Sequence, residues 1–288
     1  MKFGLMFVNV GPFGLPDHLE NLGRCAEEAG IESVFTVEHV VVPKDYKSEY
    51  PYSPTGKMPG DELAPIPDPV LPLAFLAAVT QKIRLGTGVM ILPQRHPAYV
   101  AKQAATLDTL SGGRAILGVG IGWLKEEFEA LEIPFSERAA RTEESVRAIR
   151  SLWGSETSSF DGKFYRWGAL ESYPKPVQPG GVPILVGGHV EGAARRAARI
   201  GDGFFPARGG DLKELSQLLA ALRDECGKIG RDPSEVEITV GAAPKSVDDV
   251  RRYEDLGVSR IVMPPPAFDK EGVRSGLLGF AEGLMSKL

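Results

Sequence analysis

A glutamate and a histidine stand side by side at the end of a short apolar run, as Glu38 and His39. The run 33–37 has the composition of a buried strand, and successive side chains of a strand point to opposite sides. An imidazole changes charge near neutral pH, so it can act as an acid, a base or a hydrogen-bond donor. We predict His39 as a catalytic proton donor and Glu38 as a carboxylate that tunes or orients it. The alternative is a structural His39 that only binds a neighbouring carbonyl.

Glycines gather in two other apolar runs. Gly86 and Gly88 lie inside 83–91, where a missing side chain marks a bulge or a flat ligand against the backbone. Gly118, Gly120 and Gly122 precede Trp123, but they lack the six-residue GxGxxG frame of a dinucleotide-binding turn, so a Rossmann site is disfavoured. We interpret these positions as places where a ring system approaches the backbone. Packing inside a narrow barrel is the alternative.

A third glycine run, Gly187-Gly188 followed by His189, leads from a strand into a helix. Free N–H groups at a helix start attract an anion, and glycines let a phosphate come close. Glu191 at the same terminus opposes a bare phosphate. An anion site is therefore one interpretation, and an ordinary turn is the other.

Strands and helices that alternate along the chain must position these residues. Apolar runs rich in Val, Ile and Phe are separated by segments with helical spacing. The runs are 2–8, 32–37, 83–91, 114–119, 183–187, 203–206, 236–240 and 259–263. About eight such units predict an α/β fold, a closed parallel (β/α)8 TIM barrel, because an open sheet would leave edges to protect. Catalytic groups of such barrels stand at the carboxyl ends of the strands, where the candidate residues fall.

We predict one domain, 1–288, because no linker or shift of composition divides the chain. Two insertions interrupt the pattern. The segment 40–67, after the second strand, holds six prolines and three tyrosines, and we expect an ordered lid. The segment 154–182, before the fifth strand, contains Asp161-Gly162, which is typical of a tight hairpin. We expect both insertions to cover the barrel mouth.

Composition and charge argue against several classes of protein. The net charge of -5 disfavours nucleic acid and anionic membrane as partners. No apolar run approaches the roughly 20 residues of a membrane span. Two distant cysteines and four histidines without HxH or HExxH spacing predict no metal site. With no evident signal peptide, we expect a cytoplasmic protein that binds a small molecule.

Together, the motifs resemble the luciferase-like flavin or deazaflavin oxidoreductases. The matching segments follow one another along essentially the whole chain: 1–7, 38–39, 83–89, 93–97, 107–114, 117–123 and 183–188. The stretch 120–131 is most similar to the branch that depends on coenzyme F420. The resemblance implies a TIM barrel that holds F420 or FMN at its C-terminal mouth.

The same resemblance implies roles for single residues. His39 would lie beside the ring, and a cis peptide Gly88–Val89 would lie behind it. The implied cofactor-binding residues are Gly88, Val89, Gly120, Gly122, Trp123, Gly187, Gly188 and His189, the last three beside the phosphate. Trp123 stands where sugar-phosphate dehydrogenases of this kind carry an acid, and Ile121 stands where the aldehyde-oxidising luciferase subunit carries Arg. We therefore expect neither sugar-phosphate oxidation nor light emission.

These features predict an F420-dependent oxidoreductase that transfers hydride to or from a small organic substrate. An FMN-dependent monooxygenase, supplied with reduced flavin by a partner reductase, is the alternative within the same fold. A cofactor-binding protein without turnover, and a barrel whose glycines serve packing alone, are further alternatives. By family analogy we expect a homo-oligomer, with a flavin or F420 reductase as a partner.

Overall fold

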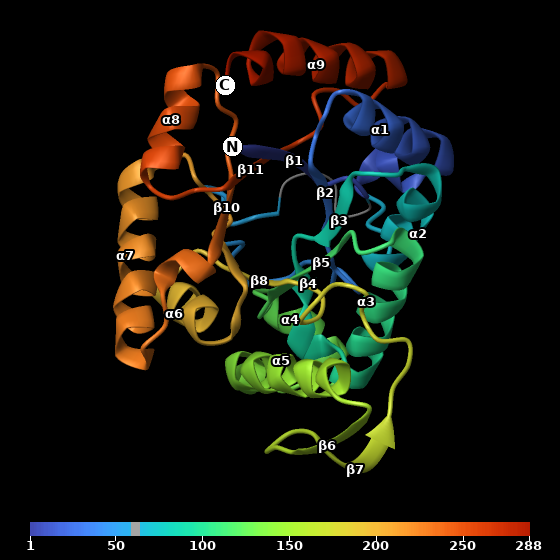
Figure 1. The fold of residues 1–288 in the computed structure, drawn as a ribbon, viewed down its shortest axis with the longest axis vertical. Helices are drawn as coiled ribbons and strands as arrows, with labels where there is room; N and C mark the ends of the chain where they lie inside the picture. The colour runs from blue at the N-terminus through green and yellow to red at the C-terminus, as the bar shows by residue number, and fades with distance from the viewer. Residues whose placement is uncertain (59–63) are drawn as a thin grey trace.

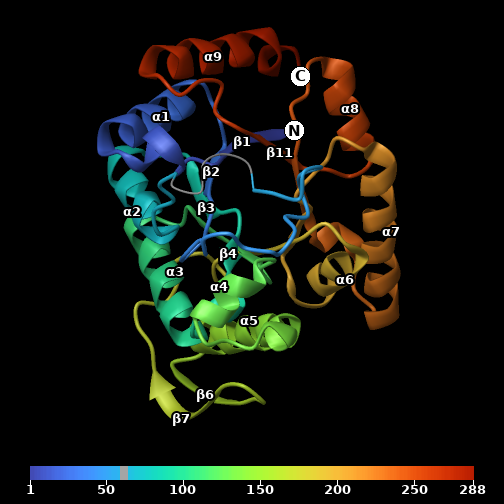
Figure 2. The ribbon, with the colours of Figure 1, turned by 180° about the vertical axis from the view of Figure 1, so that it is seen from behind.

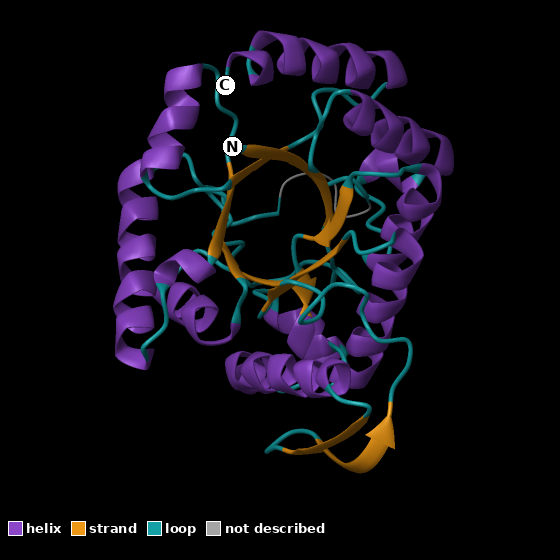
Figure 3. Cartoon of the chain, in the orientation of Figure 1, coloured by secondary structure: helices purple, strands orange, loops and turns teal. Residues whose placement is uncertain are grey.

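Parallel strands close into a ring in the computed structural model, which describes residues 1–58 and 64–288. The strand order is β3-β2-β1-β11-β10-β9-β8-β5-β4, and β3 also pairs with β5, which closes the barrel (Figure 3). The strands of the ring are β1 (Lys2–Met6), β2 (Ser33–Thr36), β3 (Arg84–Thr87), β4 (Met90–Ile91), β5 (Ala115–Gly120), β8 (Ile184–Gly187), β9 (Gly203–Phe205), β10 (Glu237–Gly241) and β11 (Arg260–Met263). The predicted α/β TIM barrel is confirmed.

Helices surround this ring on the outside (Figure 1). They are α1 (Pro16–Glu28), α2 (Val70–Val79), α3 (Pro97–Ser111), α5 (Arg138–Gly154), α6 (Glu191–Ile200), α7 (Leu212–Ile229), α8 (Val247–Asp255) and α9 (Lys270–Gly283), while the short helix α4 (Lys125–Ala130) lies in front of the ring in Figure 2. Helix α7 shows how the sequence sets their ends, since Asp211 accepts hydrogen bonds from two N–H groups of its first turn and Gly230 ends it at φ +71°. Within the described part of the chain, no helix is long and apolar enough to span a membrane.

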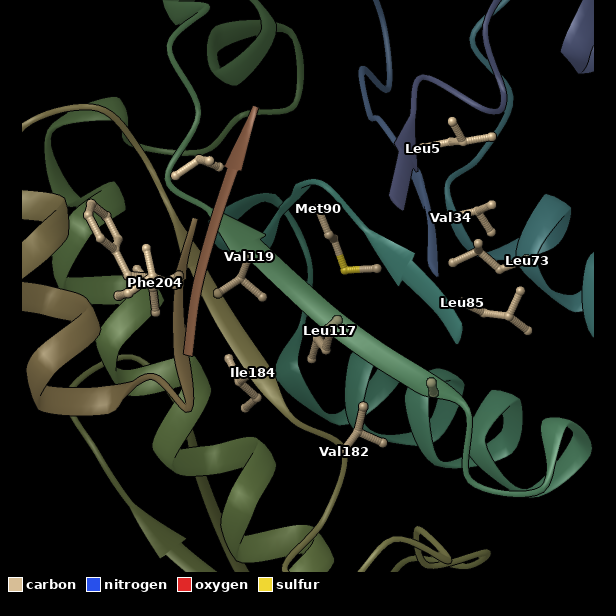
Figure 4. Close-up of a cluster of buried hydrophobic side chains, with 14 of the residues drawn as sticks. Leu5, Val34, Leu73, Leu85, Met90, Leu117, Val119, Val182, Ile184 and Phe204 are labelled. Carbon is tan, nitrogen blue, oxygen red and sulfur yellow. The ribbon is translucent and has the colours of Figure 1, made fainter. Parts of the chain in front are cut away.

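The strands are buried on both faces. One face of each strand packs inside the barrel, and the other packs against the helices. Phe35, Ile116, Leu185, Phe205 and Val262 form a small cluster inside the barrel. Adjacent residues on the same strands point outward into the larger core between strands and helices. In Figure 4, for example, Leu73 of α2 lies beside Val34 and Leu85. This alternation explains why the strands are apolar throughout.

Two strands are shorter than the sequence predicts. The run 2–8 stops at Met6, because Phe7 adopts a φ of +64°. The run 83–91 is divided into β3 and β4 at the peptide bond Gly88–Val89, which is cis, as the family resemblance implies.

The second insertion forms the expected hairpin, but it lies elsewhere than predicted. Strands β6 (Thr157–Asp161) and β7 (Arg166–Glu171) pair antiparallel. The turn between them is held on the outside of α5 by Glu144, whose carboxylate accepts hydrogen bonds from the N–H groups of 163–165. Both Figure 1 and Figure 2 show the hairpin beyond α5, away from the ring. Our expectation that 154–182 covers the mouth is therefore wrong, because the hairpin packs on the outer side of α5, where Tyr165 contacts His96 at the start of α3.

Candidate active site

The described part of the first insertion lies across the barrel mouth. In Figure 2 the segment after β2 and helix α4 lie in front of the ring of strands. We call residues 40–58 the lid; the remainder of the predicted insertion includes 59–63, which lie outside the described residues. Tyr46 of the lid is only 3% exposed. This placement agrees with the predicted ordered lid.

His39 stands at the mouth beside a carboxylate that the sequence did not reveal. Its Nδ1 lies 3.0 Å from Oε2 of Glu127, a fully buried residue of α4. The other oxygen of Glu127 accepts hydrogen bonds from the N–H groups of Val40, at 2.6 Å, and Val41, at 3.3 Å. A carboxylate held in this way orients the imidazole beside it.

Glu38 points elsewhere. Its Oε1 accepts a hydrogen bond from Nε of Arg95 at 2.9 Å, and its Oε2 accepts one from the N–H group of Ile91. Arg95 in turn contacts Asp68, whose other oxygen caps the first turn of α2. Burial raises the pKa of Glu38 above its ordinary value. The contacts with Arg95 and with the N–H group of Ile91 lower the pKa, but they offset burial only in part. The expectation that Glu38 orients His39 is thus corrected: Glu38 joins β2 to the segment after β4.

Aromatic rings cover the space around Trp123. Its ring centroid lies 5.7 Å from that of His39, 5.5 Å from that of Tyr46 and 5.1 Å from that of Tyr50, all in edge-to-face contact. Tyr52 continues the row, with its ring 5.3 Å from that of Tyr50. Burial raises the pKa of Tyr50 to about 12, so its hydroxyl is uncharged at neutral pH.

The two sides of the lid carry different kinds of side chain. The charged side chains at 44, 45, 47, 49 and 57 are exposed, whereas Tyr46 is buried and Tyr50 and Tyr52 are half-buried. The inner side of the lid therefore presents tyrosine rings, and the ammonium group of Lys57 lies over the Tyr46 ring, 4.1 Å from its centroid.

Glu126 fastens the lid to α4. Its Oε1 accepts hydrogen bonds from the N–H groups of Lys47, at 2.6 Å, and Ser48, at 3.0 Å, and its Oε2 accepts one from the Ser48 hydroxyl at 2.6 Å. The Ser48 hydroxyl and these N–H groups lower the pKa of Glu126 to about 2. The carboxylate therefore stays charged at neutral pH.

Two of the predicted cofactor-binding glycines make room for Val89. A Cβ atom at Gly120 would lie 2.5 Å from Cγ2 of Val89, and one at Gly187 would lie 2.6 Å from its Cγ1. A Cβ atom at Gly88 would crowd Phe35 and Phe205 at about 3 Å. Barrel packing thus accounts for these three glycines, and their contact with a cofactor stays a prediction. Val89 is half-buried and packs on the interior cluster from the mouth side.

Gly122 and Trp123 form the turn that leads from β5 to α4. Gly122 has a φ of +79°, and a Cβ atom there would meet Phe128 and Ile91. The turn places the Trp123 ring under the lid, beside His39. The structure therefore brings Trp123, Val89 and His39 to the same mouth.

The start of α6 has the features of an anion site. Val190, its N-cap residue, supplies no side-chain hydrogen bond, and Gly188 before it has a φ of +134°. The charge of Glu191 is paired with Arg195 at 2.8 Å. Half-exposed Arg208 lies next to the site, and its N–H group donates a 3.4 Å hydrogen bond to Nδ1 of His189. Open N–H groups at the start of the helix suit a phosphate, and the guanidinium of Arg208, which lies 3.7 Å from Glu214, is the nearby cation.

The side chain of His189 is enclosed. Its side chain is 4% exposed, and its Nε2 lies 3.1 Å from a carboxylate oxygen of Glu214, without the alignment of a hydrogen bond. Tyr52 of the lid contacts the same ring, at 6.5 Å between centroids. His189 thus lies between Tyr52 of the lid and Arg208, beside the predicted anion site.

Several residues of the mouth escaped sequence reasoning. Glu126 and Glu127 carried a signal, since they follow the glycine run at 118–122 in the first turn of a helix. Gln94 stands after the third predicted strand, but sequence reasoning assigns no role to it; both polar atoms of its amide are buried and lack a hydrogen-bond partner within the described residues. Across 1–58 and 64–288, no group of three His, Cys, Asp or Glu side chains is placed to hold a metal ion.

Comparison with known proteins gives a consistent result. A profile of the family described as luciferase-like monooxygenase matches residues 1–256. A protein of Mycobacterium tuberculosis, itself uncharacterised, is 38% identical over 245 residues, which cover 84% of this chain and 83% of that protein. An F420-dependent glucose-6-phosphate dehydrogenase of Kineococcus radiotolerans is 34% identical over 230 residues, covering 78% of this chain and 63% of that protein. The crystal structure of monooxygenase RslO1 from Streptomyces bottropensis is 28% identical, with a TM-score of 0.79 over 100% of this chain and 99% of that one.

Proposed function

Because the chain belongs to the luciferase-like monooxygenase family, we propose that it is an oxidoreductase that transfers hydride between coenzyme F420 and a small organic substrate at the barrel mouth. The observation that carries the proposal is the imidazole of His39, held by Glu127 under an aromatic lid. The 34% identity to an F420-dependent dehydrogenase supports the choice of cofactor.

The residues at the mouth fit a flat, phosphorylated cofactor. Val89 supplies an apolar surface on the barrel side, and Trp123 lies under the lid, on the turn that follows the neighbouring strand β5. The uncapped start of α6 and Arg208 suit the anionic group that both F420 and FMN carry. Coenzyme F420, when bound, supplies a deazaflavin ring that accepts or donates hydride.

The chain's own residues have separate tasks in this scheme. His39 gives a proton to, or takes one from, the substrate oxygen or nitrogen that gains or loses charge. The lid excludes water from the mouth, which strengthens the electrostatic interactions inside it. Glu127 holds His39, and Glu126 holds the lid.

We also propose that the substrate is not a sugar phosphate. Trp123 occupies the position at which the resemblance implies an acid in sugar-phosphate dehydrogenases. Three rings pack against this tryptophan, and the tyrosines of the lid present uncharged rings to it. A neutral carbonyl, imine or conjugated alkene suits such a surface better than an anion.

An anaerobic assay tests the proposal. The protein is mixed with reduced F420 and a panel of neutral ketones, imines and enones, and the absorbance of the oxidised deazaflavin is followed. We expect at least one member of the panel to restore this absorbance, while glucose 6-phosphate with oxidised F420 gives no reaction. Turnover of glucose 6-phosphate would contradict the proposed substrate class.

A second candidate is an FMN-dependent monooxygenase, favoured by the likeness to monooxygenase RslO1 over the whole chain. It requires reduced FMN from a partner reductase and consumes oxygen as it forms product. Oxygen uptake that depends on reduced FMN and on a substrate would replace the F420 proposal with this one. The homo-oligomer, the reductase and the cytoplasmic location stay predictions from the sequence.

A further inference from the structure

Glu127 is a fully buried carboxylate whose hydrogen-bond partners are three groups at the start of the lid. Its side chain is 0% exposed, and its contacts are Nδ1 of His39 and the N–H groups of Val40 and Val41. Burial of a carboxylate is costly unless donors surround it. Within the described residues, His39 is the one basic side chain that lies within ion-pair distance of Glu127.

This geometry fixes which nitrogen of His39 carries the proton. An ionised carboxylate only accepts hydrogen bonds, so Nδ1 of a neutral His39 must donate to it. The second nitrogen, Nε2, is then the one left to accept a proton at the mouth. We propose that Glu127 is a positioning residue that holds His39 as the Nδ1–H tautomer and directs Nε2 toward the reacting substrate atom.

The neighbouring Glu126 makes the inference testable. Both carboxylates stand in the first turn of α4 and accept N–H groups of the lid, Glu127 at 40–41 and Glu126 at 47–48. Only Glu127 contacts His39. Removing the charge of Glu126 therefore loosens the lid alone, whereas removing that of Glu127 alters the lid and the imidazole.

The substitution Glu127→Gln keeps the size of the side chain but changes its hydrogen bonds. The amide oxygen can still accept the N–H group of Val40, which turns the amide nitrogen toward His39. Because that nitrogen only donates, Nδ1 of His39 must become the acceptor and the proton must move to Nε2. Glu127→Asp keeps the acceptor and serves as the conservative variant.

The direct measurement is the tautomer of His39 in protein labelled with ¹⁵N-histidine. The chain has four histidines, so comparison with His39→Gln assigns the signal. In spectra recorded at high pH, after the ring has lost its charge, we expect Nδ1–H in the wild type, Glu126→Gln and Glu127→Asp, and Nε2–H in Glu127→Gln. An unchanged tautomer in Glu127→Gln, or the same change in Glu126→Gln, would overturn the inference.

The catalytic consequence rests on the proposed function and is read separately. With a substrate found in the anaerobic panel, Glu127→Gln should lower kcat about 10- to 100-fold with little change in KM, by analogy with partners that orient ligating histidines. Glu126→Gln should change both KM and kcat, because it loosens the lid, but it should leave the tautomer of His39 unchanged, and this readout distinguishes the two carboxylates. If the tautomer changes as expected but no F420 turnover exists in the wild type, the proposed function fails while the assignment of Glu127 stands.

Discussion

Single residues at the mouth show how far sequence reasoning reaches. His39 could be predicted, because a histidine after a barrel strand has a restricted position and a known chemistry. Its partner could not: Glu127 lies 88 positions further along the chain and reaches His39 only through the packing of α4 on the mouth. Glu38, the adjacent carboxylate, was the natural candidate, but alternation along the strand sends it to Arg95.

The role of His39 is tested by replacing it with Gln. We expect His39→Gln to lower the rate of hydride transfer about 10²- to 10⁴-fold, the usual range for a general acid or base. Affinity for the cofactor should stay within about threefold, since the phosphate site that we propose lies at the start of α6, away from His39. Single-turnover kinetics and fluorescence titration measure the two quantities. An unchanged rate would remove His39 from the chemistry.

Arg95 provides a prediction about stability. Its guanidinium pairs with the buried Glu38, so Arg95→Leu leaves a buried charge without its partner. We expect a loss of about 3–5 kcal/mol in the free energy of unfolding, measured by urea denaturation. Arg24 is the matched control, because its pair with Glu20 is exposed and Arg24→Leu should cost no more than about 0.5 kcal/mol. Equal effects of the two substitutions would contradict the account.

At the scale of strands and helices, apolar periodicity predicted the ring well. Two predicted strands are too long, because the backbone departs from strand geometry at Phe7 and at Gly88–Val89, and apolar periodicity does not reveal such departures. The turn residues at 161–162 predict the hairpin at 157–171, but they do not indicate where it packs. Its position depends on distant contacts, of the turn with Glu144 of α5 and of Tyr165 with His96.

The glycines of β5 test the packing interpretation. A Cβ atom at Gly118 would lie 1.9 Å from the carbonyl oxygen of Thr87, which is backbone and cannot turn aside. Gly118→Ala should therefore lower the free energy of unfolding by about 1–3 kcal/mol or more. Gly227 of α7 has open space around it, and Gly227→Ala should raise stability by up to about 1 kcal/mol. Thermal and urea unfolding distinguish these results; a neutral Gly118→Ala would refute the packing argument.

The lid should loosen in acid over a defined range. The pKa of Glu126 is about 2 with the lid in place, against 4.5 for the free group. A lowered pKa means that the contact stabilises the closed lid fully above pH 4.5 and is lost as the pH falls toward 2. The amide chemical shift of Ser48 should follow this change, with circular dichroism showing where the barrel stays folded. Glu126→Gln should abolish the titration, and a midpoint near 4.5 in the wild type would show that the carboxylate is not held.

For the whole molecule, the two ends of the barrel differ in chemistry. At the closed end, fully buried Arg260 binds Glu32 and Glu237, a charge network among the starts of the strands. At the mouth, the lid, the imidazole and the anion site meet. This division follows the general rule for such barrels, in which residues at the amino ends of the strands stabilise the fold and residues at the carboxyl ends form the active site. Family membership was legible in the sequence, because it depends on many short motifs in order, and the single domain 1–288 stays a prediction.

The central claim is that the mouth is built for coenzyme F420. Its most direct test is equilibrium binding of F420 and FMN to the wild-type protein, each followed by its own fluorescence, with Trp123→Ala as the variant that alters the mouth. The account predicts micromolar or tighter binding of F420, FMN binding at least about tenfold weaker, and a loss of F420 affinity in Trp123→Ala. Tight binding of FMN with no affinity for F420 would contradict it.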